Sequence, residues 1–275
     1  MRPTSPVFKN YTAHCAFLRR PAQSIVNGIS QDSSRPKPDP MQFMEQYGRY
    51  VDALTRMGLS INLLDADERF PDGNFVEDTY LILEADNKRV MIELNPGAPS
   101  RAGEPISLRE FLPSHMKKHI LDKQFTMDGG DILEDRRTLY VGLSARIQQG
   151  VIDNLEKIAE LYDYRVHALT VPEGLHLKSG MTCLLPGYFI IQASFEPILK
   201  DLQREDASIQ YFIVPAEESY AANVLPINGK IMIPAGCPKT KEYIAQFYSP
   251  ENILEVETSQ ARLVDGALTC SSLLM

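Results

Sequence analysis

The chain has 275 residues, 44% of them hydrophobic, and a formal net charge of −8 at pH 7. Its length allows one large domain or two small ones. An acidic chain is a poor partner for nucleic acid, and no apolar run is long enough to span a membrane. No signal peptide is recognisable, and the four cysteines lack a paired spacing. Free thiols in a reducing, cytoplasmic compartment are therefore expected.

The first predicted strand covers residues 13–18, and a polar segment with three prolines follows at residues 31–40 and is expected to be a mobile loop. A helix should begin at Asp39-Pro40, because aspartate is a good N-cap and proline is favoured at the first helical position. Gly58 is expected to end it. The apolar residues that share one face of this helix are Met44, Tyr47, Val51 and Leu54.

The rest of the chain alternates between pairs of apolar strands and helical patterns. Strand pairs are expected at residues 79–83 with 89–93, 131–133 with 138–143, 176–185 with 188–193, and 224–227 with 230–234. The last pair is joined by Asn228-Gly229, a strong hairpin signal. Helices are expected at residues 144–164, 194–202 and 239–247. The final strand, residues 268–274, has only residues 13–18 left as a partner.

The spacing of these units is nearly regular. Asp131 and His176 are 45 residues apart, and the steps from His176 to Asn223 and from Asn223 to Cys270 are 47 residues each. A period near 50 residues indicates a radial or stacked array, and five such units would use the whole chain. In a closed ring, equivalent positions meet at the central axis. The ring therefore offers a reason why Asp78, the turn at residues 128–131, His176 and Cys270 should meet.

Taken singly, each candidate residue has an ordinary structural explanation. Cys270 could be a small buried residue in a strand, and His176 a hydrogen-bonded core histidine. Residues 128–131 could be only a turn closed by aspartates, while Arg101 and Arg146 could be surface charges. Together, however, a thiol and an imidazole permit nucleophilic catalysis.

Carboxylates narrow the choice of electrophile. Glu77 and Asp78 are adjacent, so in a strand they would face opposite sides. A carboxylate that accepts charge-assisted hydrogen bonds suits a guanidinium group especially well. His115 and His119, spaced i,i+4 on a helical pattern, could ligate a metal, but the lysines beside them favour a solvated basic face.

Six segments, in order and over nearly the full length, resemble the dimethylarginine dimethylaminohydrolase family of the guanidine-modifying (pentein) superfamily. The segments are Phe75-Val76-Glu77-Asp78, Pro96-Gly97-Ala98-Pro99-Ser100-Arg101, Asp128-Gly129-Gly130-Asp131, Val141-Gly142-Leu143-Ser144-Ala145-Arg146, Gly174-Leu175-His176-Leu177-Lys178-Ser179 and Val264-Asp265-Gly266-Ala267-Leu268-Thr269-Cys270. The resemblance implies an α/β fold: a five-bladed α/β propeller of ββαβ units around a pseudo-fivefold axis, with residues 1–275 as a single amidinotransferase-like catalytic domain.

The resemblance also implies roles for individual residues. Cys270 matches the nucleophile, His176 the general acid/base and Asp128 the carboxylate that orients His176 and contacts the guanidinium. The matching substrate-binding residues are Asp78 for the guanidinium, Asp72 and the Val264 carbonyl for the α-amino group, Arg101 and Arg146 for the α-carboxylate, Glu77 in support, and Ile29 in the active-site lid.

The implied activity is hydrolysis of Nω-methylated arginine to citrulline and a methylamine through a covalent thiouronium on cysteine. It requires neither a metal nor an organic cofactor. The expected partner is a small guanidino amino acid, with no nucleic acid or membrane, in a monomer or homodimer. Two alternatives stay open: the same hydrolysis of arginine or another guanidino acid, and a non-catalytic protein that binds guanidino ligands.

Overall fold

The structure is a computed structural model that describes residues 11–85, 88–143 and 149–275. Its strands are β1 Cys15–Arg19, β2 Ser60–Leu64, β3 Tyr80–Ala85, β4 Lys88–Glu93, β5 Lys117–Ile120, β6 Ile132–Asp135, β7 Thr138–Leu143, β8 Arg165–Thr170, β9 Met181–Leu185, β10 Tyr188–Ile191, β11 Gln210–Ile213, β12 Leu225–Ile227, β13 Lys230–Pro234, β14 Ile253–Val256 and β15 Leu273–Leu274. The α-helices are α1 Pro40–Arg56, α2 Glu104–Leu108, α3 Gln149–Ala159, α4 Leu177–Gly180, α5 Glu196–Glu205, α6 Pro238–Ile244 and α7 Ser259–Arg262.

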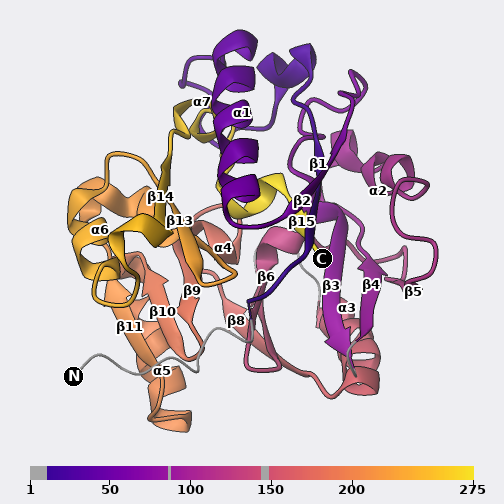
Figure 1. Cartoon of the computed structure of the whole chain (residues 1–275). Helices are drawn as coiled ribbons and strands as arrows, with labels where there is room; N and C mark the ends of the chain where they lie inside the picture. Colours follow the sequence, from indigo (N-terminus) through magenta and orange to yellow (C-terminus); the bar gives the residue numbers. More distant parts are fainter. Residues whose placement is uncertain (1–10, 86–87, 144–148) are drawn as a thin grey trace.

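The strands form five separate three-stranded sheets, or blades, arranged around a common centre (Figure 1). Their orders are β15-β1-β2, β3-β4-β5, β6-β7-β8, β9-β10-β11 and β12-β13-β14. In every blade the first two strands are antiparallel and the third is parallel to the middle one. A parallel neighbour requires a crossover, and α1, α2, α3, α5 and α6 supply it. The predicted five-bladed α/β propeller of ββαβ units is confirmed.

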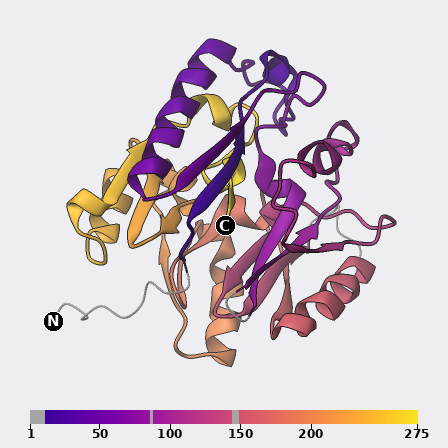
Figure 2. The ribbon, with the colours of Figure 1, turned by 45° about the vertical axis from the view of Figure 1, so that its right-hand side comes forward.

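The two ends of the chain close the ring, as predicted. Ala16 pairs with Leu274 and Phe17 with Leu273 in antiparallel register, and the C-terminus lies near the centre of the molecule in both views (Figures 1 and 2). The amide of Met275 donates to the Cys15 carbonyl over 2.9 Å. Closure gives the β1 edge a partner on each side.

Replacing Leu273 by alanine should test this closure. The Leu273 side chain is 3% exposed, so its truncation should lower the free energy of unfolding by about 2–5 kcal/mol. Leu161→Ala is the matched control, because Leu161 is 66% exposed and should change stability little. Equal urea midpoints for the two variants would show that the last strand does not hold the ring.

The hydrophobic core is divided among the contacts between neighbouring blades. Leu83 of β3 clusters with Leu139 of β7, and Leu184 of β9 clusters with Ile231 of β13. Helix α1 begins as predicted: Asp39 accepts hydrogen bonds from the amides of the first turn, and Gly58 follows the helix with a φ of 90°.

Short helical turns precede the first strand of each blade, at the end nearest the axis. They are η3 Val76–Thr79, η5 Gly129–Asp131, α4, η8 Ala216–Ala222 and η10 Thr269–Ser271. The prediction that the strands begin at residues 131, 176 and 268 was therefore wrong. Side chains of these turns hydrogen-bond the backbone of a neighbouring turn, and such contacts between turns override a local strand pattern. Such bonds run from the Gly130 amide to Asp78, from the Leu177 amide to Asp131, and from the Thr269 amide to Asn223, which directly follows η8. The Asn223 side chain also donates to the Lys178 carbonyl of α4.

Two further expectations need correction. His119 lies in β5, not in a helix, and its Nε2 is 2.6 Å from the hydroxyl of Tyr162, so the i,i+4 metal pair with His115 does not form. The helix expected at residues 144–164 is α3 followed by a 3₁₀ turn, Glu160–Tyr162; residues 144–148 lie outside the described residues. Among the described residues, no helix is long and apolar enough to cross a membrane.

Candidate active site

Eight of the ten predicted site residues line one small cavity at the axis. They are Ile29, Asp72, Asp78, Arg101, Asp128, His176, Val264 and Cys270. Cys270 lies in η10 and not in a strand as predicted. Its neighbour Thr269 lines a different cavity. Of the other two residues, Glu77 faces away from this cavity and Arg146 lies outside the described residues.

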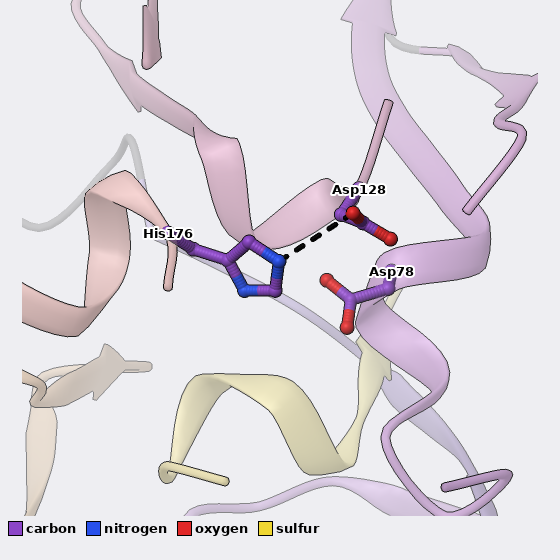
Figure 3. A group of neighbouring side chains, drawn as sticks. All are labelled: Asp78, Asp128 and His176. Atoms are coloured by element: carbon purple, nitrogen blue, oxygen red, sulfur yellow. Dashed lines mark ion pairs between the residues drawn. The ribbon is translucent and has the colours of Figure 1, made fainter. Parts of the chain in front are cut away.

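His176 and two aspartates converge from three blades (Figure 3). His176 precedes α4, Asp128 precedes η5, and Asp78 lies in η3. His176 Nε2 is 3.5 Å from Asp128 Oδ2, which is an ion-pair distance too long for a good hydrogen bond. This buried nitrogen has no hydrogen-bond partner among the described residues, and a buried polar atom of that kind is a signature of a ligand site.

The two glycines after Asp128 explain how the turns approach so closely. A Cβ on Gly129 would lie 2.1 Å from the Glu77 carbonyl oxygen, and one on Gly130 would lie 2.5 Å from His176 Nδ1. No larger residue fits either position. The Asp-Gly-Gly-Asp segment is thus more than a turn closed by aspartates, because it packs the imidazole against η3.

Asp78 is held by an arginine as well as by the backbone. Arg101 Nη1 donates to Asp78 Oδ2 over 2.5 Å, and the Gly130 amide donates to Asp78 Oδ1 over 2.8 Å. Burial alone would raise the pKa of Asp78, but the charges of Arg101 and His176 outweigh it, so the pKa is below its usual value. Asp78 is therefore an anion in the resting site.

Arg101 was expected to face a substrate carboxylate. In the structure, however, its donors are directed at groups of the protein. Besides Asp78, it binds Glu104 through Nε and Nη2 and the Phe75 carbonyl over 2.8 Å. Sequence reasoning missed Glu104, although its i,i+3 spacing from Arg101 was a signal. Burial raises the pKa of Glu104 to about 7, so this partner can lose its charge near neutral pH.

A segment that we call the strap, residues 28–35, borders the cavity through Ile29. The Ile29 amide donates to Asp72 over 3.0 Å, and the Gln31 amide donates to Asp265 over 2.6 Å. Arg35 Nη1 also donates to Asp265 over 2.6 Å. The cavity holds about 20 Å³ of water-accessible space, enough for one water molecule. This space is too small for a ligand the size of an amino acid, so the lining must move to admit one.

The sequence profile described as "N,N dimethylarginine dimethylhydrolase, eukaryotic" matches residues 21–214. An N(G),N(G)-dimethylarginine dimethylaminohydrolase of Pseudomonas aeruginosa is 34% identical over 263 residues, which cover 94% of this chain and 97% of that protein. The chain belongs to the dimethylarginine dimethylaminohydrolase family. A protein of the same name from Streptomyces coelicolor is 30% identical over 94% of this chain and 95% of its own.

Solved structures agree with this family and with the pentein superfamily. A cysteine-to-serine variant of the Pseudomonas aeruginosa enzyme in complex with citrulline superposes with a TM-score of 0.86 at 32% identity, covering 96% of this chain and all of that one. The N-terminal domain of ArgZ, a cyanobacterial arginine dihydrolase bound to its substrate, has a TM-score of 0.77 over 94% of this chain and 97% of that one. At 17% identity, the likeness to ArgZ shows the fold alone.

Glu77, which the family resemblance placed in support of the site, lies on the other side of the ring of turns. It faces a larger cavity of about 230 Å³ along the axis. Its carboxylate binds Lys178 Nζ over 2.5 Å and accepts a hydrogen bond from the Thr269 hydroxyl over 3.0 Å. Glu77 and Lys178 thus form a partly buried ion pair behind Cys270.

The charges around the cavity set the protonation of the resting site. Burial lowers the pKa of His176, but Asp78, Asp128 and Asp131 outweigh it and raise that pKa to about 9. Burial, with the charges of Glu77 and Asp78, raises the pKa of Cys270 to about 12. At neutral pH, in the absence of substrate, the His176 imidazole is therefore protonated and the Cys270 thiol is neutral.

The cluster of Asp78, Asp128 and His176 also has the spacing of a metal site. A metal ligand must be a neutral imidazole, whereas His176 is protonated up to a pH of about 9. Arg101 adds a positive charge 2.5 Å from Asp78. These charges favour an organic ligand over a metal ion, so the sequence-based expectation of a metal-free site stays a prediction.

The strap predicts a specific kinetic effect. Arg35→Ala removes the ion pair between Arg35, whose side chain is 38% exposed, and Asp265, whose side chain is 13% exposed. The variant should speed alkylation of Cys270 by about two- to fivefold. Arg20→Ala is the control, since the Arg20–Asp65 pair is exposed. If iodoacetamide labels Cys270 at one rate in both variants and the native protein, the Arg35 contact does not limit access.

Proposed function

We propose that this chain hydrolyses Nω,Nω-dimethylarginine to citrulline and dimethylamine. The observation that carries the proposal is the convergence of Cys270, His176 and Asp128 on one closed cavity in a member of this family. The named relatives from Pseudomonas aeruginosa and Streptomyces coelicolor support the choice of substrate. The catalytic unit is taken as a single domain over residues 1–275, without metal or organic cofactor.

Binding comes first. Asp78 and Asp128 hold the plane of the guanidinium by charge-assisted hydrogen bonds. Asp72 and the Val264 carbonyl receive the α-amino group, and Arg146 receives the α-carboxylate. Arg101, whose donors bind Asp78, Glu104 and the Phe75 carbonyl, holds Asp78 in place. Asp72 is bound to the Ile29 amide in the closed cavity, so the strap closes over the same group that fixes the amino acid.

The cationic substrate then activates the nucleophile. A positive charge beside Cys270 lowers the pKa of the thiol, which burial and carboxylates hold at about 12 in the resting site. The thiol loses its proton to solvent, and the thiolate sulfur bonds to the central guanidinium carbon. His176, protonated below pH 9, gives its proton to the departing nitrogen as the C–N bond breaks. Dimethylamine leaves, and Cys270 carries a thiouronium.

Hydrolysis regenerates the enzyme. The imidazole, now neutral, takes a proton from a water molecule as that water attacks the thiouronium carbon. The C–S bond then breaks, the new hydroxyl gives its proton to solvent as the citrulline carbonyl forms, and the sulfur is released as the thiolate. Asp128, 3.5 Å from Nε2, stabilises the imidazolium before the first proton transfer and again after the second.

A substrate panel tests the proposal. Purified protein is incubated with dimethylarginine, monomethylarginine, arginine and agmatine, and citrulline and released amine are quantified. We expect the highest kcat/KM for a methylated arginine. The alternative reading as an arginine-hydrolysing enzyme of the same mechanism predicts that arginine is turned over fastest. Binding of dimethylarginine without any product would instead identify a non-catalytic binding protein.

Replacing Arg146 by alanine should separate the amino-acid substrates from amines. Loss of a carboxylate partner should raise KM or cost about 2–4 kcal/mol in kcat/KM for dimethylarginine. Agmatine lacks that carboxylate, so its slow turnover should hardly change. If both substrates suffer equally, Arg146 does not bind the carboxylate; if native protein prefers agmatine, the amino-acid assignment is wrong.

A further inference from the structure

Tyr220 connects another blade to the segment that carries the nucleophile. It lies in η8, the axial turn before β12. Its hydroxyl donates a hydrogen bond of 2.8 Å to the carbonyl of Gly266. Gly266 lines the catalytic cavity four residues before Cys270. The bond therefore joins the backbone beside the thiol to a turn outside the catalytic segment.

The backbone at Gly266 has little freedom to adjust. Asp265 has a φ of 53°, in the left-handed region, and the Gly266 amide donates to the Ala261 carbonyl over 2.9 Å. A Cβ on Gly266 would lie 2.3 Å from Cζ of Phe75, which is another wall of the cavity. A shift of the Gly266 carbonyl would thus press the backbone on Phe75 or move the turn that holds Cys270.

The tyrosine ring is itself held in place. The guanidinium of Arg262 stacks over it at 4.3 Å from the ring centroid, and Arg262 Nε donates to the Thr258 hydroxyl over 3.2 Å. The carbonyl of Arg262 also accepts a hydrogen bond of 2.9 Å from Arg35 of the strap. The Tyr220 side chain, the Arg262 guanidinium and the strap therefore meet beside the catalytic segment, so the Tyr220 hydroxyl has a defined direction.

We infer that Tyr220 is a positioning residue for Cys270, acting through its hydrogen bond to the Gly266 carbonyl. The inference rests on the proposed function, because it takes Cys270 as the nucleophile. Val264 and Cys270 stand near the two ends of one segment, with Gly266 between them. The Tyr220 hydroxyl fixes this segment from the side, so that the sulfur and the Val264 carbonyl keep their separation when the strap opens and closes.

The test compares two tyrosines that make the same kind of bond. Tyr220→Phe removes the hydroxyl that binds Gly266. The control is Tyr248→Phe, because the Tyr248 hydroxyl donates to the Leu184 carbonyl over 3.0 Å in a core away from the catalytic cavity. Each change keeps the ring and leaves a carbonyl without this donor, so the effects on melting temperature should be similar.

Tyr220→Phe should lower kcat for dimethylarginine about tenfold and leave KM within about twofold, as expected for loss of one neutral hydrogen bond that matters in the transition state. The rate at which iodoacetamide alkylates Cys270 in Tyr220→Phe should also differ from the native rate by about tenfold. Tyr248→Phe should leave both rates within about twofold of native. Native rates in Tyr220→Phe, or equal losses in both variants that follow their melting temperatures, overturn the inference.

The proposed function and the role of Tyr220 can be tested separately. If native protein releases no citrulline, the proposed function fails, and the alkylation rate of Cys270 alone still decides whether Tyr220 positions the thiol. If Tyr220→Phe does not fold, Arg262→Met replaces it, since it removes the cation over the ring and keeps the hydroxyl. A loss of about threefold in kcat is then expected, and an unchanged kcat overturns the inference.

Discussion

Replacing Cys270 by serine is expected to lower the rate of citrulline formation by about 10⁴-fold or more, the scale of loss when a covalent nucleophile is removed. Serine is close to cysteine in size, and the Cys270 side chain packs in η10 at 9% exposure, so folding should be retained. Circular dichroism checks the fold, and single-turnover assays with dimethylarginine check the rate.

Cys237→Ser is the matched control. Cys237 is also buried, at 3% exposure, and its sulfur contacts the Ala235 carbonyl, away from the catalytic cavity. Turnover should remain near the native value. Intact-mass and peptide analysis after treatment with a guanidino-type inactivator should place the adduct on Cys270. An adduct confined to Cys237, or native activity in Cys270→Ser, would show that the nucleophile is a different group.

Replacing His176 by asparagine should lower kcat by about 10²–10⁴-fold, the usual contribution of a general acid and base. The native enzyme should lose activity as pH rises through about 9, because the imidazole then loses the proton that the leaving amine needs. Product release measured from pH 6 to 10 gives the profile. A native profile with no alkaline loss near pH 9 would exclude His176 as the acid.

The same substitution predicts a change in stability with a definite sign. The folded pKa of His176, about 9, lies above the ordinary value of 6.5 for histidine, so its contribution to stability is present below pH 6.5 and lost as pH rises through 9. The free energy of unfolding of native protein relative to His176→Asn should therefore be larger at pH 6 than at pH 9.5, by about 3 kcal/mol. Urea unfolding at both values measures it, and a pH-independent difference contradicts the charged resting imidazole.

The ring and its closure could be predicted because they depend on patterns that repeat. The near-constant interval between Asp131, His176, Asn223 and Cys270 reflects one structural unit used several times. Asn228-Gly229 has positive φ angles of 53° and 74°, as its predicted tight hairpin requires. These features follow from local backbone preferences and from the period, so a single sequence reveals them.

Other features depend on contacts between distant segments and left no local pattern. The turns at Asp78, His176 and Cys270 resemble strand starts in sequence, yet hydrogen bonds between blades make them short helices. Glu77 and Asp78 do face different cavities, but through a 3₁₀ turn and with a partner, Lys178, about a hundred residues away. Such pairings become visible only when the ring is closed.

Ring closure also orders events during synthesis. Strand β1 is among the first strands to leave the ribosome, whereas its neighbour β15 is the last, since Ala16 pairs with Leu274. Until β15 has emerged, the first blade lacks one strand and presents an open edge, which is a site for wrong pairing. Contacts so distant in sequence also form slowly. A nascent chain that has not yet reached η10 lacks both the strand that closes the ring and the Cys270 thiol. Such incomplete chains should therefore be inactive.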